Sequence, residues 1–177
     1  MSTVTAERIA LLLRGVNVGG VTVRSADLRD LLAEAGLRDA VTVLASGNAV
    51  VSGADAAAAA EAAEVALETR YGRRIRVLGI AIDALAAVVA RYPHGEDDAH
   101  TPYIVFELEP GVAAALADLE PGNDEAIALD ADGAAVHWSN PKGTTLTSPF
   151  AKALERTAKD RVTTRNVRTL RKVLAAA

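Results

Sequence analysis

The residues best suited to chemistry lie in a glycine-rich segment near the start of the chain, Leu12-Leu-Arg-Gly-Val-Asn-Val-Gly-Gly20. Its glycines can adopt positive φ angles, and backbone amides turned inward ahead of a helix form an anion-binding nest. An arginine can hold a phosphate or a carboxylate through two hydrogen bonds, and an asparagine can donate an amide N–H. The segment therefore predicts a site for an anionic small molecule. Its candidate residues are Arg14, Gly15, Asn17, Gly19 and Gly20.

A structural interpretation of the same segment also stands. The glycine spacing matches neither the phosphate loop of nucleoside triphosphatases nor the dinucleotide fingerprint. The glycines could serve only a tight crossing between a strand and a helix, with Arg14 paired to an acidic neighbour.

Two further segments carry polar side chains that could join this site. The triplet Ser46-Gly47-Asn48 lies between two expected strands, where it is either a ligand-binding turn or an ordinary hairpin turn. Near the C-terminus, Thr163 or Thr164 is expected to cap the last helix, which leaves Arg165 and Asn166 in its first turn. Free N–H groups and a guanidinium there could bind an anion. The additional candidates are Ser46, Gly47, Asn48, Thr164, Arg165 and Asn166.

The elements that must position these residues alternate between strands and helices. Leu28, Leu31, Leu32 and Ala35 recur at helical spacing, and Gly36 can end that helix in the left-handed conformation. The expected elements are a strand at 8–13, a helix from Ser25 to Gly36, strands at 41–45 and 49–52, a helix at 55–71, and a strand at 75–82 before a short helix.

This order, β-α-β-β-α-β, predicts a ferredoxin-like sheet with helices on one face. In that sheet the third strand runs antiparallel beside the first. We therefore expect Asn48, at the start of the third strand, to lie close to Arg14, at the end of the first.

The second half partly repeats the first. After a polar, acidic linker at 94–101, a strand, a short helix and a hairpin are expected, followed by two basic helices that begin at Ser148-Pro149 and near Thr164. The predicted architecture is α+β, with a ferredoxin-like domain at 1–93 and a second subdomain at 102–177. The second subdomain is a partial β-α-β-β repeat closed by the two helices.

Composition and charge narrow the function classes. The chain of 177 residues contains no cysteine, which excludes disulfides and thiolate chemistry. Its three histidines show no metal-ligand spacing, so neither a metal nor a cofactor is predicted. No apolar run reaches the roughly 18 residues of a membrane span, and we expect a cytoplasmic protein.

The net charge of −4 is distributed unevenly. Nine basic and two acidic residues give the segment 142–172 a charge of +7, so the remainder carries −11. The basic segment either docks on the acidic body or meets an anionic partner.

Three stretches, at 12–20, 44–51 and 163–170, together resemble a bacterial family catalogued as domain of unknown function 1697. The resemblance covers nearly the whole chain in the same order. It implies an α+β fold of two related halves and no established activity. The chain departs from the pattern at Ala45, where the family often has glutamine, and at Val167, where it often has tryptophan.

The leading functional hypothesis is binding of a phosphate- or carboxylate-bearing small molecule near Arg14, and the residues specify no reaction and no oligomeric state. One alternative is an acylphosphatase-like hydrolase, in which Arg14 holds the phosphoryl group and Asn48 orients water. Another is a nucleic-acid-binding module that uses the basic C-terminal helices. This last reading is disfavoured because the sheet lacks paired aromatic residues for base stacking and the body is acidic.

Overall fold

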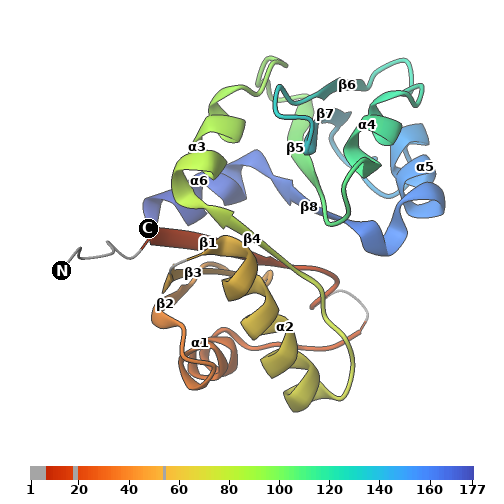
Figure 1. Ribbon diagram of the computed structural model, residues 1–177. Coiled ribbons are helices and arrows are strands. Elements are labelled where there is room, and N and C mark those ends of the chain that lie inside the picture. The colour runs from red at the N-terminus through yellow and green to blue at the C-terminus, as the bar shows by residue number, and fades with distance from the viewer. Residues whose placement is uncertain (1–6, 18–19, 54) are drawn as a thin grey trace. The chain divides into compact units, whose positions relative to one another are not determined.

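The computed structural model describes residues 7–17, 20–53 and 55–177 (Figure 1). The chain forms two compact units, and each is described by itself. The first unit comprises Met1–Ala87 with Arg171–Ala177, and the second comprises Val88–Leu170. Among the described residues, no helix has both the length and the apolar character needed to cross a membrane.

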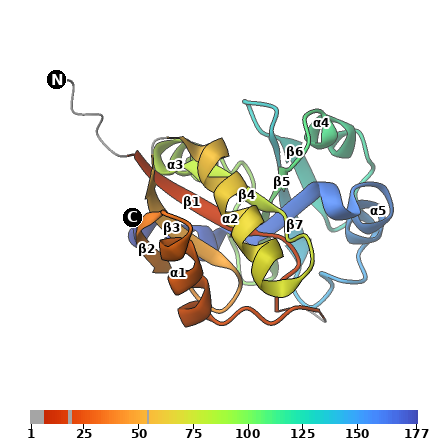
Figure 2. The ribbon, with the colours of Figure 1, turned by 60° about the horizontal axis from the view of Figure 1, so that its bottom comes forward.

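The first unit is an antiparallel four-stranded sheet in the order β2-β3-β1-β4. Helices α1 and α2 cover one face of this sheet and lie toward the viewer in Figure 2. Its elements are β1 (Glu7–Leu13), α1 (Ser25–Glu34), β2 (Arg38–Thr42), β3 (Asn48–Gly53), α2 (Ala56–Tyr71) and β4 (Val77–Ala81), and α3 (Ile82–Ala90) follows.

Helix α2 begins and ends as its sequence predicts. The Asp55 carboxylate accepts a hydrogen bond from the Ala57 N–H at 2.7 Å, and Gly72 ends the helix with a φ of 68°. Two details differ from the prediction. Ser25 is not a cap, because its hydroxyl donates to the Leu44 carbonyl. The strand expected at 41–45 ends at Thr42, and Leu44 adopts a φ of 57° in the turn that follows.

The core of the first unit depends on the alternation of side chains along β1. Ile9, Leu11 and Leu13 pack against the leucines of α1 and the alanines of α2. Gly79 on β4 lies beneath the first turn of α2. A Cβ atom at Gly79 would lie 2.0 Å from the Ala56 carbonyl oxygen, so this close approach requires glycine.

The second unit has the same strand order, β6-β7-β5-β8, and is again antiparallel. Residues of α4 and α5 share one core cluster with β5, β7 and β8. The elements are β5 (His100–Glu107), α4 (Val112–Ala117), β6 (Ala126–Leu129), β7 (Ala135–Pro141), α5 (Pro149–Thr157), the short 3-10 helix η1 (Lys159–Arg161), β8 (Val162–Asn166) and α6 (Val167–Ala175). Strand β5 begins inside the segment expected to be a linker.

The last strand corrects the sequence-based prediction. Residues 163–166 were expected to start the final helix, but they belong to β8, which pairs with β5. Helix α6 begins only at Val167, and the Asn166 side chain accepts a hydrogen bond from the Arg168 N–H at 2.8 Å. The second unit is therefore a complete β-α-β-β-α-β arrangement rather than a partial one.

A half-buried carboxylate ties three segments of the second unit together. The Glu125 oxygens accept hydrogen bonds from Trp138 Nε1 at 3.0 Å, from the Gly122 N–H at 2.8 Å and from the Phe150 N–H at 3.1 Å. Burial alone would raise the pKa of Glu125, but hydrogen bonds from Ser148, the two backbone amides and Trp138 outweigh it and lower the pKa. Glu125 thus connects the segment that precedes β6 to β7 and to the start of α5.

A second carboxylate, Asp130, is buried at the β6–β7 turn. It accepts two hydrogen bonds from the Arg91 guanidinium, at 3.0 and 2.7 Å, and lies 2.9 Å from His137 Nε2. Burial would raise the pKa of Asp130, but the hydrogen bonds from Arg91, the Asp132 N–H and His137 prevail and lower it to about 2. The hairpin is thereby bound to the segment after α3.

We expect Gly79→Ala to destabilise the protein by about 2 kcal/mol or more, because the new methyl group would meet helix backbone that cannot move aside cheaply. Urea unfolding followed by circular dichroism measures this. Gly95→Ala is the matched control, since no atom lies within 4 Å of a Cβ at that position. Equal midpoints for the two variants would contradict the close approach of α2 to β4.

Because its pKa is lowered in the folded protein, Asp130 makes the free energy of unfolding depend on pH in the acidic range. Its folded pKa of about 2 lies below its ordinary value of 3.8, so its contribution is complete above about pH 4 and is lost as the pH falls through about 2. We expect Asp130 to account for about 2 kcal/mol of the unfolding free energy lost over that range. The free energy of unfolding, measured at a series of pH values, should fall less steeply with acid in Asp130→Asn than in the wild type. Asp132→Asn, which alters an exposed carboxylate, should keep the wild-type slope; the same flattening in both variants would refute the assignment.

Candidate functional site

The register of β1 assembles the candidate site in the first unit. Leu12 lies opposite Asn48 on β3, and Leu13 lies opposite Val77 on β4. One residue further on, the Arg14 N–H donates to the Arg76 carbonyl at 2.8 Å. The end of β1 is therefore flanked by the 44–47 turn on one side and by Arg76 on the other.

Side-chain alternation then decides which groups share a face. Leu13 and Val77 belong to the core beneath α1 and α2, so their neighbours Arg14 and Arg76 fall on the opposite face. Asn48, which lies opposite Leu12, falls on that face as well. Arg14, Arg76 and Asn48 thus lie at one corner of the sheet, on the face opposite α1 and α2.

Arg14 and Arg76 form a pair of like charges across two strands. Hydrogen-bonded neighbours in an antiparallel ladder have Cα atoms about 5.5 Å apart, which is well within reach of two guanidinium groups. Both side chains are half-buried. The sequence analysis missed Arg76, which the strand pairing of the predicted fold places opposite Arg14.

Asn17 connects the glycine-rich loop to two neighbouring segments through its side chain. Its side-chain oxygen accepts from the Val23 N–H at 2.8 Å, and its amide nitrogen donates to the carbonyls of Val23 and Ala45. Asn17 has a φ of 60° and Gly15 a φ of 66°, so the backbone turns sharply here. Gly15 and Gly20 are exposed, whereas Gly19 lies outside the described residues. The side chain predicted to donate to a ligand instead ties the loop to the neighbouring turn.

The Ser46-Gly47-Asn48 turn is also held internally. The Asn48 amide nitrogen donates to the Val43 carbonyl at 3.1 Å and to the Ser46 hydroxyl at 2.7 Å, and the side chain is fully buried. Gly47 adopts a φ of 70°, and a Cβ there would lie 2.4 Å from Val16. The turn therefore packs closely beneath the glycine-rich loop.

The third candidate segment lies in the second unit, on β8. Arg165 donates to the Thr163 hydroxyl and to the Thr164 carbonyl, each at 2.9 Å. Asn166 caps α6. The structure thus groups Arg14, Ser46, Gly47 and Asn48 in one unit and Thr164, Arg165 and Asn166 in the other. A common site for the two groups stays a prediction.

The histidines occupy structural positions. The His94 ring lies edge-on to Tyr92, and His94 Nε2 lies 3.4 Å from the His137 carbonyl. Burial is the main cause that lowers the pKa of His94 and raises that of Tyr92 to about 12. His100 contacts the Asp97 carboxylate at 3.0 Å. Within the part of the chain that the structure describes, no group of three or more acidic, histidine or cysteine side chains could hold a metal ion.

Comparison with known proteins identifies the family. No protein of curated function matches the chain. The structure of the conserved bacterial protein SP0830 from Streptococcus pneumoniae is similar, with 24% sequence identity, a TM-score of 0.80, and coverage of 96% of this chain and 97% of that one. This likeness concerns the fold alone. The sequence model described as "Protein of unknown function (DUF1697)" matches residues 6–137. This match includes the first two of the three motifs and confirms the resemblance, and the chain belongs to the DUF1697 family.

Proposed function

We propose that the protein binds an anionic small molecule, bearing a phosphate or a carboxylate, between Arg14 and Arg76. The observation that carries this proposal is the pairing of the two arginines across β1 and β4, on the face of the sheet opposite α1 and α2. A phosphate or carboxylate between two guanidinium groups accepts charge-assisted hydrogen bonds from both.

The loop beside the two arginines supports the same ligand class. It follows Arg14 directly, and hydrogen bonds of Asn17 with Val23 and Ala45 hold the backbone at Asn17 before any ligand arrives. Backbone that is already held in this way loses little conformational entropy on binding, so more of the interaction energy appears as affinity. The exposed backbone at Gly15 and Gly20 lets a ligand approach the chain closely.

Binding is better supported than hydrolysis. An acylphosphatase-like role needs the Asn48 amide to orient a water molecule, but both of its hydrogens are directed to Val43 and Ser46 within the turn. The nucleic-acid alternative gains no support either, since Arg165 and Asn166 bind groups of their own segment.

We also propose that both units are ferredoxin-like and arose as related halves. Each runs β-α-β-β-α-β, and each places its first strand between its third and fourth. In this proposal the predicted linker at 94–101 joins the halves at 1–93 and 102–177.

Titration with inorganic phosphate at constant ionic strength tests the site, with the Arg14 and Arg76 Nε–H signals followed by NMR. We expect Arg14→Gln and Arg76→Gln each to weaken phosphate binding about tenfold or more, because each removes a charged hydrogen bond worth about 1.5–3 kcal/mol.

Arg73→Gln is the control for net charge. Arg73 is exposed and lies three residues before Arg76, so its loss should leave the phosphate affinity nearly unchanged. Equal weakening in all three variants would mean non-specific attraction, and unchanged affinity in Arg14→Gln and Arg76→Gln would overturn the proposal.

A further inference from the structure

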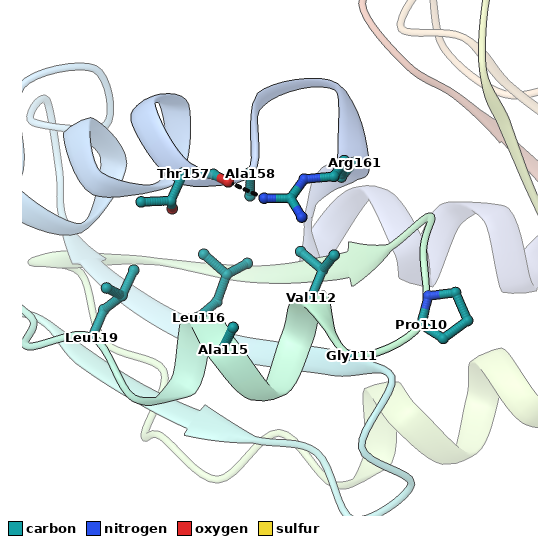
Figure 3. A pocket seen from close by; sticks show the side chains of 9 residues that line it. All are labelled: Pro110, Gly111, Val112, Ala115, Leu116, Leu119, Thr157, Ala158 and Arg161. Atoms are coloured by element: carbon teal, nitrogen blue, oxygen red, sulfur yellow. Dashed lines mark hydrogen bonds between the residues drawn. The ribbon is translucent and has the colours of Figure 1, made fainter.

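A pocket of about 350 Å³ lies within the second unit, between α4 and the junction of α5 with η1 (Figure 3). On the α4 side, Val112 and Leu116 project into it, and Leu119 lies at one end. On the opposite side lie Thr157 and Ala158. Two helical segments distant in sequence therefore line a small, largely apolar pocket.

Among the described residues that line this pocket, Arg161 alone is charged. Its guanidinium reaches back over the pocket, between Ala158 and Val112, and donates to the Thr157 carbonyl (Figure 3). The last carbonyls of a helix lack partners within it, so this hydrogen bond satisfies the end of α5 and holds the guanidinium in place. A guanidinium has five N–H donors, and its remaining hydrogens can serve a ligand.

The Arg161 backbone is also held by hydrogen bonds on both sides. Its N–H donates to the Ala158 carbonyl at 2.7 Å, and its carbonyl accepts from the Leu108 N–H at 2.8 Å. These bonds tie η1 to α5 on one side and to the end of β5 on the other. The positive charge is thus positioned before a ligand enters, which lowers the entropic cost of binding.

The walls offer hydrocarbon rather than further hydrogen bonds. The Thr157 hydroxyl is directed away, donating to the Ala153 carbonyl at 2.7 Å. The Ala115 N–H donates to the Gly111 carbonyl at 3.2 Å. A ligand that fills the pocket therefore meets methyl and methylene groups along its body and a guanidinium at one place.

We propose that this pocket binds a small monocarboxylate with an apolar body, such as an aromatic or branched aliphatic acid, with its carboxylate on Arg161. The volume lies within the range of about 300–1,000 Å³ typical of small-ligand sites. Burial of the ligand's hydrocarbon against Val112 and Leu116 contributes affinity, and the planar guanidinium matches a carboxylate in shape and charge. A dianion would bring a second charge against apolar walls, where it lacks a partner, so a monoanion fits better.

This site is separate from the one proposed at Arg14, because its lining residues all belong to the second unit. It was not among the candidates derived from the sequence. There, Arg161 is one of nine basic residues in a charged segment, and nothing in its spacing distinguishes it.

The test is an NMR titration of the full chain with benzoate and, separately, with benzyl alcohol. The methyl signals of Val112, Leu116 and Leu119 report occupation of the pocket. We expect benzoate to shift these signals and to bind about tenfold or more tightly than the neutral alcohol, the difference expected for a charged hydrogen bond. Arg161→Gln should remove that difference, because glutamine carries no positive charge to pair with the carboxylate.

Matched variants distinguish the pocket from general effects. Ala115→Leu should abolish the shifts for both probes by filling the space, whereas Ala114→Leu places the same side chain on an exposed neighbour outside the pocket and should bind as the wild type. Arg156→Gln removes a nearby exposed charge and should have little effect. Any of three results would overturn the proposal: no shift of the methyl signals, equal affinity for the two probes, or unchanged benzoate binding in Arg161→Gln.

Discussion

The register of β1 between β3 and β4 is the constraint on which the first unit depends. Side chains alternate along a strand, so Leu11 and Leu13 can reach the core beneath the helices only if Leu12 and Arg14 face the other way. The same register sets Asn48 opposite Leu12 and brings Arg76 beside Arg14. Core packing and the geometry of the proposed anion site are therefore consequences of one hydrogen-bonded ladder.

Polar side chains do much of the positioning in both units. The Asn17 amide donates to the carbonyls of Val23 and Ala45, and the Asn48 amide donates to the Val43 carbonyl and the Ser46 hydroxyl, so both side chains connect segments around Arg14. In the second unit, Glu125 and Asp130 are half-buried or buried carboxylates, and each is held by several donors from separate segments. Buried polar groups are costly unless their hydrogen bonds are made, and so satisfied networks of this kind specify one arrangement of the chain.

The two units share a strand order, yet the proposed sites use different parts of it. The Arg14 site belongs to the face of the first sheet without α1 and α2, at the end of its first strand. The Arg161 pocket lies among the helical segments of the second unit, beside α4. In units of the same architecture, the loops and helix ends therefore determine where a site lies. For the same reason, the similarity of fold to SP0830 does not identify a ligand.

The sequence by itself determined the elements whose signals are local. The apolar run of β1, the capped alanine-rich helix α2 and the leucine spacing of α1 follow from periodicity and capping, and three motifs indicated the family that the comparison confirmed. Tertiary structure decided what depends on partners distant in the chain. Residues 162–166 became a strand because β5 offers an unpaired edge, and Arg171–Ala177 joined the first unit. Likewise, Arg76 and Arg161 gained their neighbours only through packing, because no local pattern encodes which charge will face which strand or pocket.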